Sequence, residues 1–323
     1  MFVVYLIPGI VLLSLGATWL TDGASALAKR LGVSEFLIGV TIVAVGTSMP
    51  ELVVSIKSAI VGQADVSIGN VVGSNVFNVF AILGLTTMIA PMTLTKGNVR
   101  RDIPICIAAS FLLFMLSLDG TLFGCGENVL SRVDGLVFLL GYALFLVYAI
   151  RSGRKAGQNA PSVDPKAEEA PVKEMKMWKM FVLVVLGICG LVFGADMFLD
   201  GAIELARILG LSEAVIGIVI VAAGTSLPEL FASIVPAIKG KSEIALGNII
   251  GSNIANILLI LGSSATITPL HLGGITTVDM SMMLATAVMV MLSALVIGKN
   301  KITRFEGFIF FAIYVAYTVY LLR

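Results

Sequence analysis

Charged residues are scarce in this chain. Of its 323 residues only 13% are Asp, Glu, Lys or Arg, whereas 58% are hydrophobic, and the formal net charge is +1. The charged share is about half that of an ordinary soluble domain, and the mean hydropathy is +1.03. This composition argues against a water-soluble fold, and the charge balance predicts neither a nucleic-acid partner nor a strongly acidic one. We expect a lipid bilayer to be the main solvent of the chain.

Histidine and cysteine, which supply many metal sites and catalytic groups, are nearly absent. His271 is the single histidine, and Cys106, Cys125 and Cys189 show no metal-ligand spacing. A zinc site, a disulfide framework and a proton relay built on histidines are therefore not expected. With a single histidine and no metal-ligand spacing, the chain also lacks an evident pairing of nucleophile and base, so we expect no enzymatic activity and no cofactor.

Apolar runs long enough to cross a bilayer core of about 30 Å recur along the whole sequence. The first run has no basic leader and no cleavage site, so we expect it to be retained as a membrane span. The ten predicted spans are Phe2–Leu20, Glu35–Val61, Val66–Ala90, Ile103–Leu118, Val133–Ile150, Trp178–Leu199, Glu213–Ile238, Ile244–Ile267, Val278–Ile297 and Phe305–Leu322. The predicted fold class is an all-α membrane protein with ten transmembrane helices.

The spans fall into two sets of five, separated by a polar stretch. Residues 153–176 are rich in Pro, Ala, Lys and Glu and contain almost no large apolar side chain, so they cannot bury enough surface to become ordered. We therefore divide the chain into a first five-helix repeat (1–150), a flexible linker (151–177) and a second five-helix repeat (178–323).

The two sets are copies of each other. Glu229 lies 178 residues after Glu51, and the same offset pairs Ser74 with Ser252 and Pro91 with Pro269. About half of the positions from Ser34 to Gly84 are identical to their partners, which indicates an internal duplication. The repeated motifs span residues 39–84 and 217–262.

Lysine and arginine predict the orientation of the spans. Basic residues follow the first, third, fifth, seventh and ninth spans, which places all of them on one side of the membrane, the cytoplasmic one. We therefore expect a multi-pass protein of the plasma (inner) membrane with a cytoplasmic linker and both termini on the opposite side. Because each copy holds an odd number of spans, the copies are expected to be inverted, a design that recurs in transporters.

Each copy contains a segment with unusual polar residues for a membrane span, Gly-Thr-Ser-Met-Pro-Glu at 46–51 and Gly-Thr-Ser-Leu-Pro-Glu at 224–229. A carboxylate at membrane depth costs about 3 kcal/mol or more, and no lysine or arginine recurs beside both glutamates. Helix geometry puts the two hydroxyls on the face of the carboxylate. Pro50 has no N–H group, so we expect the carbonyl oxygens of Gly46, Val45 and Ala44 to be free to turn inward. Such hard oxygen donors are typical of a calcium or sodium site.

The next span of each copy reads Gly-Asn-Val-Val-Gly-Ser-Asn-Val-Phe-Asn at 69–78 and Gly-Asn-Ile-Ile-Gly-Ser-Asn-Ile-Ala-Asn at 247–256. Its serine and last asparagine share a helix face, and its glycines, four residues apart, permit close helix packing. A lone intramembrane serine or asparagine more often joins helices than binds a ligand, but here the combination occurs twice in register. Acids at span ends, such as Asp22 and Glu243, are more simply explained by helix capping or interfacial solvation.

With these motifs the sequence resembles the sodium/calcium exchanger family of the cation/calcium antiporters, whose two repeats carry GTSxPE and GSNxxN helices. The resemblance covers nearly the whole chain and implies ten helices, a cytoplasmic linker and exchange of sodium against calcium. We predict no protein partner. The resemblance also implies twelve ion ligands: Ala44, Thr47, Ser48, Glu51, Ser74, Asn78, Ala222, Thr225, Ser226, Glu229, Ser252 and Asn256. Some members carry aspartate at the position of Asn256, which leaves the stoichiometry and proton coupling open here.

The expected mechanism is alternating access, in which calcium and sodium compete for overlapping sites around Glu51 and Glu229. The alternatives are a calcium/proton antiporter, in which a glutamate takes up a proton on each return, and a cation channel that uses the same oxygen ligands.

Overall fold

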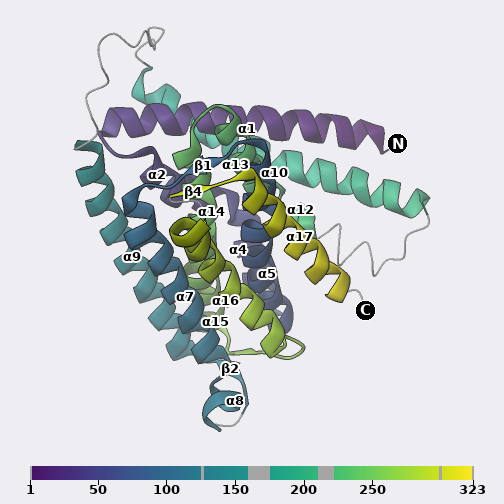
Figure 1. Cartoon of the computed structure of the whole chain (residues 1–323). Helices are drawn as coiled ribbons and strands as arrows, with labels where there is room; N and C mark the ends of the chain where they lie inside the picture. The colour runs from purple at the N-terminus through teal and green to yellow at the C-terminus, as the bar shows by residue number, and fades with distance from the viewer. Residues whose placement is uncertain (1, 125–126, 159–174, 210–221, 298–299, 322–323) are drawn as a thin grey trace.

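The computed structural model describes residues 2–124, 127–158, 175–209, 222–297 and 300–321. The described part of the chain is a bundle of helices, and its strands are limited to two short antiparallel pairs (Figure 1). The elements of the first half are α1 Val3–Leu31, α2 Glu35–Ile38, η1 Gly39–Val43, α3 Ala44–Thr47, α4 Met49–Ile60, α5 Ala64–Val76, η2 Phe77–Leu83, α6 Gly84–Ile89, β1 Met92–Thr93, η3 Asn98–Asp102, α7 Ile103–Ser117, α8 Asp119–Phe123, β2 Val129–Leu130 and α9 Arg132–Gln158.

The described part of the second half repeats this order, except that its π-helical turn η6 follows α16, whereas η3 precedes α7, and that no counterpart of α8 is described. Its elements are α10 Met177–Ile208, α12 Ala222–Thr225, α13 Leu227–Ile238, α14 Ser242–Ala255, η5 Asn256–Leu261, α15 Gly262–Ile267, β3 Leu270–His271, α16 Thr277–Leu292, η6 Ser293–Ile297, β4 Lys301–Ile302 and α17 Arg304–Leu321. Residues 159–174 of the predicted linker and residues 213–221 of the seventh predicted span lie outside the described residues.

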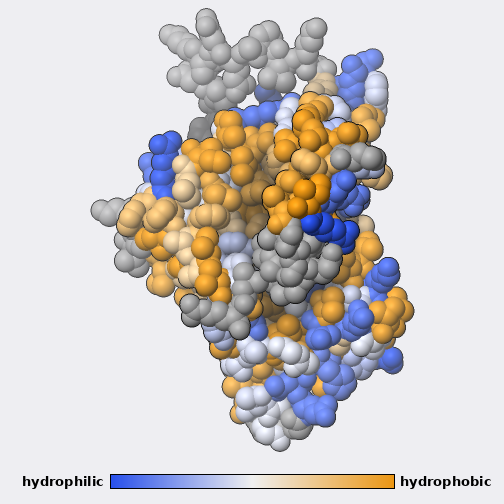
Figure 2. Space-filling view, turned by 90° about the vertical axis from the view of Figure 1, so that its right-hand side faces the viewer, coloured by the Kyte–Doolittle hydropathy of each residue, from blue (hydrophilic) through white to orange (hydrophobic). Residues whose placement is uncertain are grey.

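Membrane-spanning character is confirmed for most of the predicted spans. Seven of the described helices, or eight with the bent pair formed by Glu35–Thr47 and Met49–Ile60, are long and apolar enough to cross a bilayer. Figure 2 shows one face of the surface, where hydrophobic side chains cover much of the upper half and hydrophilic ones gather mainly toward the lower end. In lipid only helices or closed barrels satisfy every backbone polar group, which explains the all-helical body.

Two long helices, α1 and α10, pack against each other along a seam of glycines. A Cβ atom built on Gly16 would lie 2.7 Å from the backbone nitrogen of Leu191, and one built on Gly187 would lie 2.6 Å from that of Leu20. Lipid tails are as apolar as side chains, so helices in membranes associate by such close packing of small residues. Both helices continue past the predicted spans, because α1 ends at Leu31 and not at Leu20, and α10 ends at Ile208 and not at Leu199.

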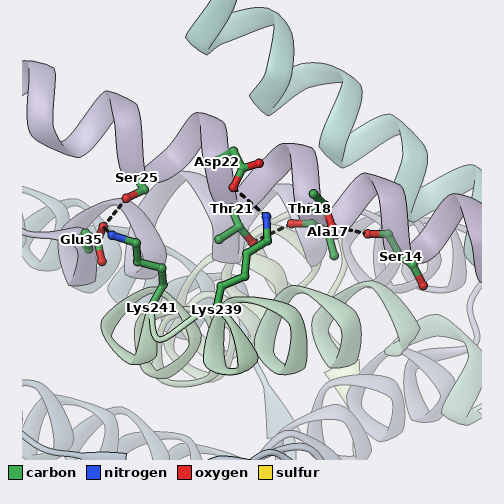
Figure 3. A network of polar contacts seen from close by, with 9 residues as sticks. All are labelled: Ser14, Ala17, Thr18, Thr21, Asp22, Ser25, Glu35, Lys239 and Lys241. Carbon is green, nitrogen blue, oxygen red and sulfur yellow. Dashed lines mark hydrogen bonds and ion pairs between the residues drawn. The ribbon is translucent and has the colours of Figure 1, made fainter. Parts of the chain in front are cut away.

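Polar contacts along the second half of α1 are shown in Figure 3. Lys239, in the turn after α13, forms a 2.7 Å ion pair with Asp22 of α1, and Lys241 forms one of 2.9 Å with Glu35 of α2, which also accepts from Ser25. These four charged side chains line a cavity of about 1820 Å³ that is also bounded by Asn98, Asp102 and Glu243. Neither Glu51 nor Glu229 lines this cavity.

The two strand pairs each join one half of the chain to the other. β1 pairs with β4, with Met92 opposite Ile302, and β2 pairs with β3, with Val129 opposite His271. Figure 1 places β1 and β4 near one end of the bundle and β2 near the other. The last helix of each half likewise packs on the opposite half, α9 against α15 and α17 against α6.

Candidate cation-binding site

The helix that carries Glu51 is broken next to the candidate ligands. The segments α2–α3 and α4 meet at Ser48, where the backbone leaves helical geometry (φ −83°, ψ 12°), and the two helical parts are bent by 49°. Pro50 lies in the first turn of α4, where its missing N–H group costs no hydrogen bond. Ser226 makes the equivalent break between α12 and α13 (φ −94°, ψ 10°), and Pro228 follows it. The repeated sequence therefore produces the same local structure twice.

One expectation about this break is wrong. The carbonyl oxygen of Ala44 is not free of helical hydrogen bonds, because it accepts from the backbone N–H of Ser48 at 3.0 Å and from Oγ1 of Thr47 at 3.2 Å. The helix continues through α3 up to Thr47, so the proline ring disturbs only the turn directly before it. The carbonyl oxygen of Gly46 still receives no helical hydrogen bond from residue 50, because Pro50 has no N–H group.

The two glutamates lie close together and are buried, with Glu51 1% and Glu229 2% exposed. Each accepts a hydrogen bond from the serine three residues before the other glutamate. Ser48 Oγ donates to Glu229 Oε1 at 2.8 Å, and Ser226 Oγ donates to Glu51 Oε1 at 3.3 Å. Two helix breaks, one from each half of the chain, thus face each other across a buried pair of carboxylates.

Several buried oxygen atoms of the glutamates and of other candidate ligands have no hydrogen-bond partner. Among the described residues, the buried side-chain atoms without one include Glu51 Oε2, Glu229 Oε2, Asn78 Oδ1, Asn256 Oδ1 and Ser252 Oγ, all of them candidate ligand residues. Buried polar atoms are nearly always hydrogen-bonded, so such a group of unpaired acceptors needs an explanation. Carboxylate, amide and hydroxyl oxygens are the ligands that sodium and calcium prefer. The donor set fits a hard cation.

The remaining candidates lie on the same helices. Thr47 is fully buried and its Oγ1 also donates to Asn248 Oδ1 at 3.1 Å. Ser74 of α5 is buried, and Thr225 of α12 is partly buried. Ala222 begins α12, and its backbone is described whereas its side chain is not.

Close packing brings the second half's GSNxxN helix against the first half. A Cβ atom on Gly251 would lie 2.7 Å from both the Cα and the carbonyl oxygen of Val40, and one on Gly247 would lie 2.7 Å from the carbonyl oxygen of Phe36. The expectation that these glycines permit close approach is confirmed for α14. For the equivalent Gly73 of α5, no described atom lies within 4 Å.

Four polar residues around the site were missed as functional candidates. Asn70 Nδ2 donates to the carbonyl oxygen of Glu51 at 3.2 Å, and Asn248 Nδ2 donates to that of Glu229 at 3.2 Å. Asn75 and Asn253 bond to each other's backbone and to the candidates Asn256 and Asn78. All four recur at the offset of 178 residues, and that repetition was the signal in the sequence.

A helical membrane protein whose two halves bring two buried carboxylates together, and whose other candidate ligands carry unpaired buried oxygen atoms, has the features of a cation transporter. The chain belongs to the sodium/calcium exchanger protein family, whose model matches residues 1–151 and 179–323. It is therefore a cation/calcium antiporter by family.

Relatives of known name support this assignment over the full length. A putative antiporter, CaxA, of Alkalimonas amylolytica is 36% identical over 97% of this chain and 96% of its own length. The sodium/calcium exchanger MaX1 of Methanosarcina acetivorans is 34% identical, with 98% of this chain and 97% of its own covered. A solved structure of the sodium-calcium exchanger NCX_Mj, soaked with 10 mM Na⁺ and no Ca²⁺, superposes with a TM-score of 0.82 at 30% identity and covers 100% of this chain and 99% of its own.

Proposed function

We propose that this chain exchanges sodium ions for calcium ions across the membrane at one site between its halves. The observation that carries the proposal is the buried pair Glu51 and Glu229, each held by the other half's serine and each with an unpaired Oε2 atom. The ligands are the twelve residues that the family resemblance implies. Calcium takes about six to eight oxygen ligands, and two carboxylates neutralise its charge.

The proposed architecture is ten transmembrane helices in two inverted five-helix repeats. It is supported by the strand pairs β1–β4 and β2–β3, which are equivalent to each other because β3 repeats β1 and β4, like β2, precedes the last helix of its half. It is also supported by the reciprocal packing of α9 on α15 and α17 on α6. With an odd number of helices in each repeat, these two strand pairs belong to opposite sides of the membrane. The linker is cytoplasmic, both termini lie on the other side, and the membrane is the plasma (inner) membrane.

The mechanism is alternating access, and the charge pair explains why the carrier exchanges ions instead of leaking them. When no cation is bound, two carboxylates in a poorly solvated site repel each other. The empty site is then unfavourable in any closed conformation, so the carrier returns only with an ion bound. Calcium and sodium occupy overlapping oxygen ligands, which makes their binding mutually exclusive.

Sodium-driven calcium uptake in proteoliposomes tests this function. An outward sodium gradient is expected to drive calcium uptake by the parent, and Glu51→Gln or Glu229→Gln is expected to reduce the rate at least about a hundredfold, because loss of a paired carboxylate costs on the order of 3 kcal/mol.

Glu306 provides a matched control. It is as buried as Glu51, at 1% exposure, but its carboxylate caps α17 through Thr303 and accepts from Ser293. Glutamine also serves in such caps, so Glu306→Gln is expected to keep transport within a few-fold of the parent. Rapid sodium-driven flux in Glu51→Gln or Glu229→Gln would refute the proposed site.

The second candidate function is exchange of calcium for protons. The same buried carboxylate pair favours it, because a carboxylate that releases a cation can accept a proton in its place. Imposed gradients separate the two functions: calcium uptake driven by a proton gradient and indifferent to sodium would replace sodium with protons as the counter-ion. Saturable flux that requires a counter-ion would exclude a channel.

A further inference from the structure

Four buried asparagines meet where the GSNxxN helices of the two halves cross. Asn75 and Asn78 belong to α5 and η2, Asn253 and Asn256 to α14 and η5, and each is at most 2% exposed. Asn78 and Asn256 are candidate ion ligands, whereas Asn75 and Asn253 have no role in the proposed function. The hydrogen bonds among the four are arranged with twofold symmetry.

Asn75 and Asn253 are tied to each other through their backbones. Asn75 Nδ2 donates to the carbonyl oxygen of Asn253 at 3.3 Å, and Asn253 Nδ2 donates to that of Asn75 at 3.4 Å. Their side-chain oxygens accept from the candidate ligands, Asn75 Oδ1 from Asn256 Nδ2 at 3.0 Å and Asn253 Oδ1 from Asn78 Nδ2 at 3.0 Å.

The direction of these hydrogen bonds is fixed by the two backbone carbonyls that accept the first bond of each series. A backbone carbonyl only accepts hydrogen bonds, so it requires the NH₂ end of the Asn75 or Asn253 amide. The oxygen end of that amide is then presented to the next asparagine, and it in turn requires an NH₂ group. Reversing any one amide would bring two acceptors together.

The last amide in each series of hydrogen bonds is that of Asn256 or Asn78. Because its NH₂ group is used for the bond to Asn75 or Asn253, its oxygen lies at the end away from that bond. Asn78 Oδ1 and Asn256 Oδ1 are the atoms of the quartet without a hydrogen-bond partner, and both are buried. We propose that Asn75 and Asn253 are positioning residues that turn the amide oxygens of Asn256 and Asn78 toward the transported cation. This inference rests on the proposed function, because it presupposes a cation at the site.

The physical consequence is a difference in affinity. An amide presents a partial negative charge at its oxygen end and a partial positive charge at its NH₂ end, so only one orientation binds a cation. If Asn75 is replaced by a residue with a hydrocarbon side chain, the Asn256 amide loses the acceptor that fixes its orientation. The fraction of molecules in which the Asn256 oxygen faces the ion then falls. A carboxylate at 256 would remove this dependence, because both of its ends are oxygen.

A double-mutant cycle with Asn75→Leu and Asn256→Asp tests the proposal through radioactive calcium binding to the purified full-length protein. Asn75→Leu alone is expected to weaken binding roughly three- to tenfold, the worth of one hydrogen bond. Added to Asn256→Asp, it is expected to leave the affinity of that variant unchanged or to improve it, because the carboxylate at 256 would otherwise lie against Asn75 Oδ1. Equal weakening in both backgrounds would mean that Asn75 only packs the helices and would overturn the inference.

The symmetric cycle, Asn253→Leu with Asn78→Asp, provides an independent second test with the same expected outcome. Asn75→Ala serves where Asn75→Leu does not fold. Val76→Ala, at a buried neighbour on α5, is the packing control and is expected to have the same effect in both backgrounds. Absence of calcium binding by the parent would refute the proposed function itself, whereas additive effects on a binding parent would refute only the orienting role.

Discussion

Asn248 and Asn70 hold the backbone of the two glutamates in place. Asn248 Nδ2 donates to the carbonyl oxygen of Glu229 and, at 3.0 Å, to Ser233 Oγ, and its Oδ1 accepts from Thr47 Oγ1. Asn70 makes the equivalent donations to the carbonyl oxygen of Glu51 and to Ser55. Since these bonds fix the turn that carries each carboxylate, both asparagines should affect ion binding without touching the ion.

Asn248→Leu is therefore expected to be more harmful than Asn70→Leu. Asn248 is fully buried, and its loss removes the donor to the Glu229 carbonyl and to Ser233 Oγ and one of the two acceptors of Thr47 Oγ1. A buried polar group left unpaired costs about 1–3 kcal/mol, whereas Asn70 is partly exposed, so water can replace its bonds. Thermal melting of the detergent-solubilised variants checks the order, and calcium binding is expected to follow it. Equal melting temperatures for the two variants would contradict this account of the Asn248 contacts.

Asp102, which precedes α7, gives the fold a dependence on pH. Burial raises the pKa of the Asp102 carboxyl to about 6, and the neighbouring Arg101 partly offsets this rise. A raised carboxyl pKa stabilises the fold below the unfolded value near 4, and this contribution is lost as the pH rises through 6. Asp102→Asn is expected to raise the melting temperature at pH 7 and to leave it nearly unchanged at pH 4. A gain of the same size at both pH values would exclude this explanation.

The sequence could identify the glutamates but not the residues that support them. Glu51 and Glu229 are conspicuous because a carboxylate in an apolar span requires a reason. Asn75 and Asn253 are not, because an intramembrane asparagine usually joins helices, and the direction of an amide cannot be read from residue types. The repetition of these asparagines in both halves was the signal in the sequence. Repetition alone does not distinguish an ion ligand from a residue next to it.

At the scale of elements, the contact of α14 with η1 depends on the absence of side chains. Gly251→Ala would place a methyl group 2.7 Å from the Val40 backbone and 2.8 Å from Ala44 Cβ. Overpacking of this kind costs about 1–3 kcal/mol, so a lower melting temperature is expected.

Gly141→Ala is the control, since Gly141 is also a helical glycine, in α9, and the nearest described atom to the new Cβ, Leu258 Cδ2, lies at an ordinary contact distance of 3.6 Å. Helix propensity favours alanine over glycine by up to about 1 kcal/mol, so this variant should melt at the parent temperature or above it. Similar destabilisation by both substitutions would show that the close contact at Gly251 is not the cause.

Hydropathy alone does not predict where the helices end or where they contain π-helical turns. The span boundaries followed the apolar runs, yet α1 continues through Lys29 and Arg30 to Leu31, where basic side chains suit the end of a helix. The segments η2 and η5 widen the two helices that carry the candidate ligands Asn78 and Asn256, after Val76 and Ala255. Such turns are frequent at functional sites, but they arise from packing between helices and leave no mark in local sequence.

On the scale of the whole molecule, the ion pairs between the two halves break the symmetry of the repeats. Lys239 and Lys241 pair with Asp22 and Glu35, whereas their counterparts 178 residues earlier are Val61 and Gln63, which are uncharged. Exposed ion pairs contribute at most about 1 kcal/mol each and are screened by salt. Melting of the parent should therefore be salt-sensitive, and the Lys239→Ala/Lys241→Ala variant should be less so. An unchanged salt response would contradict this.

The central claim is that Glu51 and Glu229, from opposite halves, bind the same cation. Anomalous diffraction from crystals soaked in strontium, a heavier analogue of calcium, tests it directly. We predict one strong peak within about 2.3–2.7 Å of both Glu51 Oε2 and Glu229 Oε2, the range of hard-cation ligands. A peak beside only one of these carboxylates, or ions bound only elsewhere, would contradict it.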